Sequence, residues 1–405
     1  MNNGSPASRS SKKGLPITGN PLIHRGTGTY MNRVSLVIFE GGRPESYVEE
    51  QVTAVRKAVV LDNLEKFSEV PELDNIFLYT TYEDLAVAAA ERGAESQVIP
   101  AVKEFRFGEA LARVIKARSL EAVIYMGGAS GSLMAQSEVS ALAKCLAVSP
   151  EVMLANNIFS SDIVGFTPAS RLLDVAELPT SDNALAMALS FLDHRKLPET
   201  IGSLFDVDTP ADITVLRLHP ATGPNVRAAL GKLDLEPAAS RLRKVRETMG
   251  IPLSEVCVIG RVSPGAVLYV NERLQCRMRV FSEERGMKAL GREDHHQAVS
   301  LLGYLAQQVG FEGLVSALEK VADAVLIDTR VLFHHLNLEL PAKDRFNSDL
   351  LRPDAIDNPV ARKLTACLLS SSIPIVPGGH SLVSGGLRVI TDSLVNEGEL
   401  IGGGA

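Results

Sequence analysis

The sequence contains no tryptophan, and aromatic residues make up only 5% of its 405 residues. No apolar stretch approaches the roughly 18 residues that a membrane-spanning helix needs, so no membrane partner is expected. Basic residues are neither grouped in blocks nor interleaved with aromatics, and the net charge is −7. A surface that binds nucleic acid through phosphate charge and base stacking is therefore not expected either.

Cysteine is also scarce. The four cysteines show neither a CxxC pair nor a metal-ligand spacing; they are Cys145, Cys257, Cys276 and Cys367. This pattern is typical of core or surface thiols in a reducing compartment. Residues 1–31 are rich in Ser, Gly, Asn and Pro and lack the apolar segment of a secretory signal. We expect a disordered tail there and a cytoplasmic location.

Short apolar runs alternate with amphipathic segments between residues 32 and 215. Strands are expected at 34–39, 75–80, 96–100, 122–126 and 162–167, and helices at 45–67, 82–92, 108–117, 136–146 and 183–192. This alternation predicts an α/β fold, in which helices flank both faces of a mostly parallel sheet. The length of the chain suggests two or three domains.

The pattern changes after residue 215. Residues 216–250 are charged and helical in pattern but interrupted by prolines, and we interpret them as a helical connector. In residues 251–405, strands are expected at 256–259, 266–270, 275–281 and 324–328, and helices at 297–309, 311–322 and 360–369. This part is predicted to form a C-terminal α+β domain.

The run Phe205–Ile213 contains two acids, Asp206 and Asp208, on either side of a β-branched residue. In an extended segment both carboxylates project to the same face, and Thr209 and Pro210 are suited to begin a helix directly afterwards. Carboxylates at such a turn suit a divalent cation beside phosphates. The alternative is an ordinary capped turn between a strand and a helix.

A second candidate is the turn Gly41-Gly42-Arg43, which follows the first expected strand. Glycine lets backbone N–H groups approach a phosphate closely, and Arg43, with Arg56 or Lys57 on the next helix, adds positive charge. A Gly-Gly pair after a strand is also common as a plain structural turn, and that interpretation stays open.

The order of the motifs is more specific than any one of them. In sequence order they are Gly41-Gly42, Thr80–Asp84, Phe107–Leu111, Met126–Ser130, Ser160–Ile163 and Asp206–Asp212. Together they resemble the nucleotidyltransferases with a glycosyltransferase-A-like fold, such as phospholactate guanylyltransferase and the molybdenum-cofactor nucleotidyltransferases. The resemblance covers residues 32–215. It implies a Rossmann-like fold and transfer of a nucleoside monophosphate from an NTP to a small phosphorylated or hydroxyl acceptor, with release of pyrophosphate.

The resemblance also implies where the nucleotide binds. In that family a glycine-rich loop cradles the triphosphate, and a turn after the central strand completes the site. The corresponding cofactor-binding positions are Gly41, Gly42, Arg43, Gly127, Gly128 and Ser130. The second turn normally carries an Asp that binds Mg²⁺, and Ala129 occupies that position here.

The implied cofactor is Mg²⁺, with Asp206 and Asp208 as its ligands. Asp162 lies in the segment that faces the acceptor in the family, so the candidate catalytic residues are Asp162, Arg43 and Lys57. The implied partners are an NTP and a small-molecule acceptor, and a homodimer is a candidate assembly.

Two departures from the family favour other hypotheses. Ala129 removes one metal ligand, while Glu40 and Glu45 flank the glycine turn, where negative charge repels a triphosphate unless a metal or an arginine offsets it. Under this hypothesis the protein is catalytically degenerate, and it binds a nucleotide or sugar nucleotide or has a regulatory role. A further alternative places the activity in the C-terminal domain.

The C-terminal domain has its own polar candidates. They are Asp328 and Arg330, at the end of an expected strand, and His380, between glycine pairs in the turn Pro377–Gly386. Glycines around His380 suit an anion-binding nest. The alternative is a structural ion pair and a plain loop.

Overall fold

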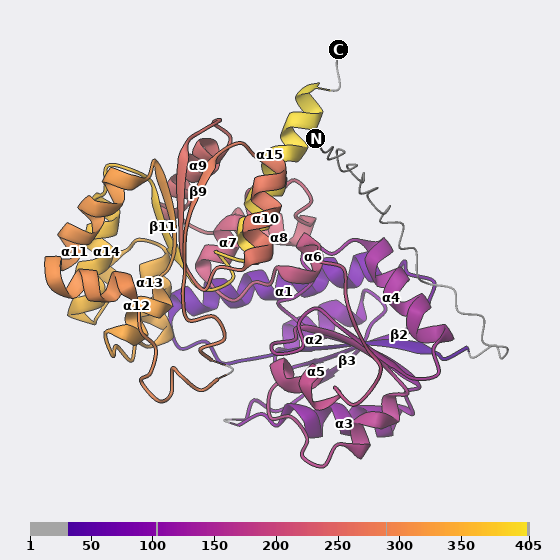
Figure 1. Ribbon diagram of the computed structural model, residues 1–405. Coiled ribbons are helices and arrows are strands. Elements are labelled where there is room, and N and C mark those ends of the chain that lie inside the picture. The colour runs from indigo at the N-terminus through magenta and orange to yellow at the C-terminus, as the bar shows by residue number, and fades with distance from the viewer. Residues whose placement is uncertain (1–30, 103, 289, 403–405) are drawn as a thin grey trace, which may run out of the picture.

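The computed structural model describes residues 31–102, 104–288 and 290–402. Residues 1–30 lie outside this part, and so does nearly all of the expected N-terminal tail. Two β-sheets, each covered by helices, make up the described chain, and the long helix α1 (Tyr47–Phe67) runs between them (Figure 1).

The first sheet has seven strands in the order β3-β2-β1-β4-β6-β5-β7. Their bounds are β1 Val34–Glu40, β2 Leu73–Thr80, β3 Glu95–Val98, β4 Ala122–Gly127, β5 Val152–Ala155, β6 Ile163–Thr167 and β7 His194–Lys196. Strands β1 to β4 are parallel, whereas β6 is antiparallel to β4 and β5. The start of β6 therefore lies at the edge where β1 and β4 end, here called the carboxyl edge.

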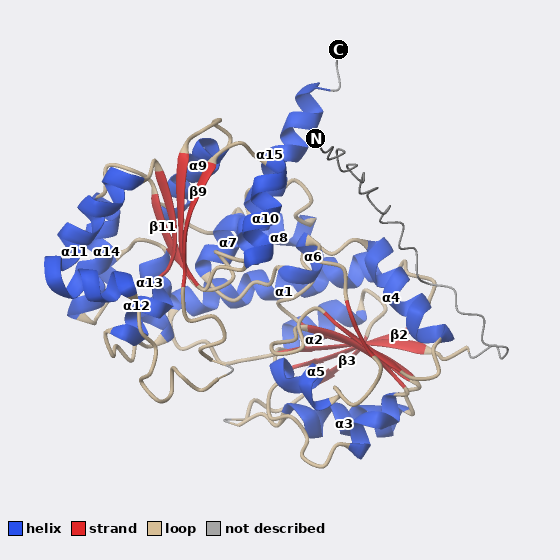
Figure 2. Cartoon of the chain, viewed as in Figure 1, coloured by secondary structure: helices blue, strands red, loops and turns tan. Residues whose placement is uncertain are grey.

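Helices cover both faces of this sheet (Figure 2). Their bounds are α2 Glu83–Ala90, α3 Phe107–Arg118, α4 Gln136–Val148 and α5 Leu185–Ala188. Leu36 and Ile38 of β1 pack in one apolar cluster with α1, α2 and α4. Val37 and Phe39 pack in another with α3 and α5. Because successive side chains of a strand point to opposite faces, the continuous apolar run of β1 matches burial on both sides.

The second sheet has four strands, all parallel, in the order β11-β10-β8-β9. The strands are β8 Glu255–Gly260, β9 Arg277–Ser282, β10 Ala324–Asp328 and β11 Ile375–Gly378. The helices that follow α5 in the chain are α6 Ile201–Leu204, α7 Pro210–Leu216, α8 Pro224–Leu230, α9 Ala238–Met249, α10 Pro264–Arg273, α11 Leu301–Val321, α12 Thr329–His335, α13 Ala342–Asp349, α14 Pro359–Ser370 and α15 Gly385–Gly402. Helices α7, α9, α10 and α15 share a core with one face, and α11, α12 and α14 with the other. The predicted α/β class is confirmed, and residues 251–405 contain the expected sheet and helices.

Helix α1 contributes to the cores of both sheets. Val48, Val52 and Val55 belong to the cluster that contains Val258 of the second sheet, whereas Leu64 belongs to a cluster of the first. Residues 216–250 hold the helices α8 and α9, and α9 packs in the core of the second sheet. The division of the chain at residues 215 and 250 stays a prediction.

One expected strand is a helix, and the extended segment around Asp206 does not join a sheet as a full strand. Residues 266–270 belong to α10, because Pro264 occupies the start of that helix and the buried side chains of Ala266 and Val270 lie one turn apart. The segment around Asp206 is held by an isolated bridge to Ser130 rather than by a full strand ladder. Within the described residues, no helix is both long enough and apolar enough to cross a membrane.

Candidate active site

The acids of the Asp206 motif lie at the carboxyl edge of the first sheet. Val207 N–H donates to the main-chain oxygen of Ala129 at 3.1 Å, which ties the motif to the turn after β4. Asp162 directly precedes β6 and stands at the same edge, where Gly127 N–H donates to its main-chain oxygen at 3.1 Å. In parallel sheets ligands bind at this edge. The structure therefore brings Asp162 and the Asp206 motif together.

The turn after β4 is shaped by Glu40. A Cβ atom at Gly128 would lie 2.2 Å from Glu40 Oε2, so only glycine fits there. Ser130 is buried, and its main-chain oxygen accepts a hydrogen bond from Asn63 Nδ2 at 2.9 Å. Ala129 is also buried, in the same apolar cluster as Val207. The position at which the family resemblance leads us to expect an acid therefore belongs to the core.

Glu40 does not act as a free acid beside the glycine turn. Its carboxylate is buried and lies 3.0 Å from Arg56 Nη2. Burial lowers the pKa of Arg56, but the charges of Glu40 and Asp208 outweigh this effect and raise it. Arg56 therefore stays charged between these two acids. The expected repulsion of a triphosphate by Glu40 is offset by this arginine.

The other candidates of this half are more exposed. Gly41, Gly42 and Arg43 are solvent-accessible, and Gly42 N–H donates to Thr81 Oγ1 at 3.3 Å. Lys57 Nζ lies 2.8 Å from Asp84 Oδ1. Lys57 is therefore committed to an ion pair on the first sheet's side of α1, and its catalytic role stays a prediction.

The carboxylates of the motif repel one another. Burial raises the pKa of Asp206 well above its ordinary value, and the charges of Asp208 and Asp162 raise it further. Burial and Asp208 likewise raise the pKa of Asp162 to about 7, although Asn156 Nδ2 donates to this carboxylate at 3.3 Å. The negative charges of these three acids thus influence one another, and the net effect favours the protonated forms of Asp206 and Asp162. A cation would relieve this repulsion.

The predicted helix start after the motif is confirmed. Helix α7 begins at Pro210, and the carboxylate of Asp212 accepts hydrogen bonds from Thr209 N and Thr209 Oγ1, both at 2.8 Å. Burial and Asp208 raise the pKa of Asp212 to about 7. The alternative interpretation, a capped turn before a helix, is therefore present, and the carboxylate that makes the capping hydrogen bonds is that of Asp212. Asp206 and Asp208 are left available for another role.

The carboxyl edge of the second sheet contributes residues to the same place. Ser381 Oγ donates to the main-chain oxygen of Asp206 at 3.4 Å. A Cβ atom at Gly379 would lie 3.5 Å from Thr209 Cγ2. The turn around His380 therefore contacts the Asp206 motif directly. The surrounding protein lowers the pKa of His380, and Arg261 lowers it further, whereas Asp328 and Asp208 oppose this.

Two ion pairs hold this second edge. Arg261 binds Asp328 through Nε at 2.6 Å and Nη2 at 3.1 Å. Arg330 binds Asp349 through Nη1 at 2.8 Å and Nη2 at 2.6 Å. Asp328 is buried, and Arg261 outweighs the burial and lowers its pKa. Asp328 and Arg330 each form a structural ion pair, as the alternative interpretation expects. They do not pair with each other: the partner of Asp328 is Arg261, and that of Arg330 is Asp349.

The site can be tested for its fit to Mg²⁺. Among the described residues, no three His, Cys, Asp or Glu side chains are grouped to hold a metal ion by themselves. Mg²⁺ commonly binds through one or two carboxylates, with phosphate oxygens and water as its other ligands. Asp206 and Asp208, with the raised pKa of Asp206, fit this donor set.

Sequence reasoning named Arg56 as added positive charge but not as the partner of Glu40, and it missed Arg261 as the partner of Asp328. Arg261 directly follows β8, and a basic residue at that position was a usable signal. The pairing of Arg56 with Glu40 depends on how α1 crosses the sheet, and no local pattern encodes that crossing.

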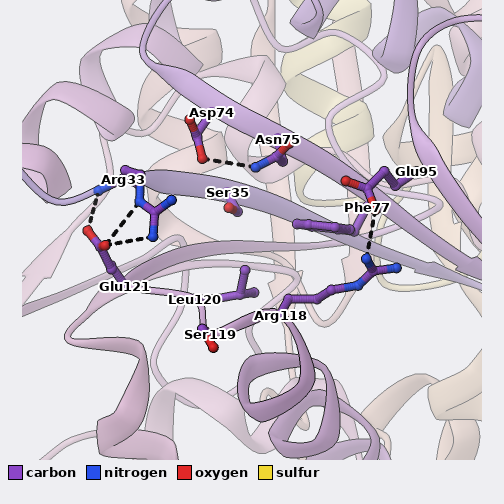
Figure 3. A pocket seen from close by; sticks show the side chains of 10 residues that line it. All are labelled: Arg33, Ser35, Asp74, Asn75, Phe77, Glu95, Arg118, Ser119, Leu120 and Glu121. Atoms are coloured by element: carbon purple, nitrogen blue, oxygen red, sulfur yellow. Dashed lines mark hydrogen bonds and ion pairs between the residues drawn. The ribbon is translucent and has the colours of Figure 1, made fainter.

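A polar cavity of about 160 Å³ lies at the opposite edge of the first sheet, where the strands begin (Figure 3). Both of its arginines are paired with carboxylates: Arg33 Nη2 lies 2.9 Å from Glu121 Oε1, and Arg118 Nη1 lies 2.8 Å from Glu95 Oε2 (Figure 3). With its arginines already paired and at the amino-terminal ends of the strands, this cavity is not the candidate site.

Comparison with known proteins gives distant structural likenesses. No model of a known protein family matches the sequence, and no curated protein matches it. A cytidylyltransferase from Leptospira borgpetersenii is 13% identical, with a TM-score of 0.36 over 46% of this chain and 86% of its own. CMP:2-keto-3-deoxy-manno-octonic acid synthetase complexed with CTP is 11% identical, with a TM-score of 0.33 over 46% of this chain and 97% of its own. 4-Diphosphocytidyl-2C-methyl-D-erythritol synthase from Anaerococcus prevotii is 13% identical, with a TM-score of 0.31 over 49% of this chain and 95% of its own.

Proposed function

We propose that this protein is an Mg²⁺-dependent nucleotidyltransferase, which transfers a nucleoside monophosphate from an NTP to a small acceptor. The observation that carries this proposal is the group of three carboxylates, Asp162, Asp206 and Asp208, at the carboxyl edge of a mostly parallel sheet. Their mutual repulsion raises the pKa of Asp206 and of Asp162. Acids that raise one another's pKa at a ligand-binding edge favour a site built for a cation and its anionic ligand.

Asp206 and Asp208 would hold the Mg²⁺ ion. When bound, Mg²⁺ neutralises phosphate charge and thereby favours attack on the α-phosphorus. Arg56 supports these acids from α1, because its charge is shared between Glu40 and Asp208. This arrangement keeps the positive charge of Arg56 at the site while Glu40 remains buried.

The exposed turn Gly41-Gly42-Arg43 would bind the triphosphate. The turn is exposed at the end of β1, with Gly42 N–H bonded to Thr81 Oγ1, and Arg43 forms no ion pair with any described residue. An arginine without a carboxylate partner keeps its donors for phosphate oxygens. These features support the triphosphate position that the glycine turn suggests.

The transfer itself requires little covalent chemistry from the protein. An acceptor oxygen attacks the α-phosphorus, the new P–O bond forms, and the bond from the α-phosphorus to the oxygen bridging to the β-phosphate breaks. Pyrophosphate leaves with that electron pair. Where the acceptor is a hydroxyl, Asp162 takes its proton, since Asn156 holds the carboxylate at the same edge. Where it is a phosphate oxygen, no proton transfer is needed.

The proposal is tested by measuring pyrophosphate release from each of the four NTPs in the presence of Mg²⁺ and a panel of phosphorylated and hydroxylated acceptors. Wild-type protein is expected to release pyrophosphate with at least one pair, and Asp206→Asn to lose this activity. Absence of both turnover and NTP binding in the wild type would contradict the proposal.

A second candidate is a protein that binds nucleotides without turning them over. The burial of Ala129 in the core favours it, because this turn then supplies no metal ligand. NTP binding with Mg²⁺, but without pyrophosphate release for any acceptor, would identify this case.

A further inference from the structure

The first half of α11 presents an apolar face to solvent. Leu301, Tyr304, Leu305 and Val309 lie on one side of this helix, because residues three and four positions apart share a face. Their side chains are 38–68% exposed, so no described part of the chain covers them. Single exposed apolar side chains are normal on a protein surface, whereas a contiguous group is typical of a contact with another molecule. These four residues are here called the α11 patch.

The opposite side of the same helix is packed in the core. Leu302 and Ala306 belong to the apolar cluster that covers one face of the second sheet. A Cβ atom at Gly303 would lie 2.1 Å from His335 Cδ2, so α11 approaches α12 closely. Ser300 Oγ accepts a hydrogen bond from Gly303 N at 3.1 Å, which caps the start of the helix. Packing and capping therefore hold the α11 patch outward in a fixed position.

Charge is absent from this part of the helix. Residues 297–311 contain no Asp, Glu, Lys, Arg or His. Beyond the break at Gly310, where φ is 75°, the exposed positions of the helix include Glu312 and Lys320. The exposed face thus changes from uncharged to charged within one helix. A charged protein surface finds no opposite charge on the α11 patch, and an anionic membrane surface needs basic residues that this segment lacks.

A second copy of the chain fits these properties. Each copy carries a net charge of −7, so an uncharged face is where two copies approach with the least repulsion. In a twofold contact a patch meets itself and must be complementary to itself. Leu301, Leu305 and Val309 form a ridge at i, i+4 and i+8, the kind of ridge that interdigitates in the commonest class of helix pairs. Leu305 is the midpoint of this ridge.

We propose that the α11 patch is the contact surface of a twofold homodimer, in which α11 packs antiparallel to the same helix of a second copy. Leu305 then lies at the twofold axis, and Leu301 lies opposite Val309 of the partner subunit. The positive end of each helix dipole lies near the negative end of the other. Helix α11 is on the outer side of the second sheet, away from the first sheet (Figure 1). The contact therefore does not involve the candidate active site, and it does not depend on the proposed nucleotidyl transfer.

The first test is analytical ultracentrifugation of the full chain. The wild type is expected to form a dimer at micromolar concentration, the weak end of the range for protein interfaces. Leu305→Glu is expected to weaken the dimer by about a hundredfold or more, because two carboxylates meet at the axis. Val87→Glu is the matched control, since Val87 is 62% exposed on α2, and it is expected to dimerise as the wild type does. Circular dichroism is expected to be the same for all three proteins.

The second test does not depend on disrupting the contact. In Leu305→Cys the two introduced thiols face each other across the axis, so oxidation with copper–phenanthroline is expected to link two chains through a disulfide. Val87→Cys is expected to give no more linked dimer than the wild type, in which Cys145 is half-buried. A monomeric wild type, which would leave the α11 patch to another partner, would overturn the proposal. So would an undiminished dimer in Leu305→Glu, or equal linking of Leu305→Cys and Val87→Cys.

Discussion

Ser381 Oγ donates a hydrogen bond to the main-chain oxygen of Asp206 at 3.4 Å, and thereby joins the last turn of the chain to the acidic motif. The contact is reinforced where α15 begins, because a Cβ atom at Gly385 would lie only 2.1 Å from the main-chain oxygen of Leu204. The acids of the first half are thus held in place by the second half, and a site at their position depends on both.

Gly385→Ala is expected to destabilise the protein by about 1–3 kcal/mol, the range for overpacking a filled position, because the added methyl group meets backbone rather than a movable side chain. Chemical denaturation measures this change. The control is Gly231→Ala, at the end of α8, where the nearest atom would be 3.5 Å away and φ is −63°. Equal stability of the two variants would show that α15 does not fix the motif.

Ala129→Asp is expected to destabilise the protein rather than to restore a metal ligand. The side chain of Ala129 is 6% exposed and packs in an apolar cluster, so a carboxylate there loses its hydration without gaining a partner. The expected cost is about 2–5 kcal/mol in the free energy of unfolding. Ala135→Asp is the control, since Ala135 is exposed at the start of α4, where Asp is a favourable cap. A folded Ala129→Asp variant with higher activity than the wild type would contradict the assignment of residue 129 to the apolar core.

Asp349→Asn is expected to cost about 3–5 kcal/mol, because it leaves the buried guanidinium of Arg330 without its charged partner. Asp174→Asn, which removes an exposed partner of Arg171, is expected to cost at most about 1 kcal/mol. Thermal unfolding of both variants provides the comparison. Similar losses in the two variants would show that the Arg330 pair is not buried in solution.

Burial raises the pKa of the Cys257 thiol from 9.0 to about 12. Because the raised pKa belongs to the folded state, the stabilisation that it represents is complete below pH 9 and is lost as the pH rises through about 12. At pH 9 we expect iodoacetamide to label Cys257 about tenfold or more slowly in the native than in the denatured protein. The half-buried Cys145 is the internal control and should react in the native state. Equal native labelling of both thiols would contradict this.

Local patterns were enough to predict most of the fold. The apolar run at 34–39 and the helix start at Pro210 follow from burial on both faces and from capping chemistry, and both are present. The strand expected at 266–270 was wrong, because a short apolar run fits a helix as well as a strand and Pro264 decided between them.

The site was predictable only in part. The acids Asp206 and Asp208 were visible as a local pattern, and their proximity to Asp162 follows from the shared carboxyl edge. Contacts between the two sheets were not visible. The meeting of Ser381 with Asp206 joins residues 175 positions apart, and it depends on packing that no periodicity encodes.

The central claim is that Asp206 and Asp208 hold Mg²⁺ for an NTP. It is tested most directly by calorimetric titration of NTPs into wild-type protein and Asp208→Asn, each with Mg²⁺ and with EDTA. Asp208 is exposed and its charge repels the neighbouring acids, so the variant is not expected to lower the unfolding temperature, and neither is the control Asp354→Asn on an exposed turn. NTP binding is expected to require Mg²⁺ and to weaken by about tenfold or more in Asp208→Asn alone. NTP binding that is indifferent to both Mg²⁺ and Asp208→Asn, or no NTP binding in the wild type, would contradict it.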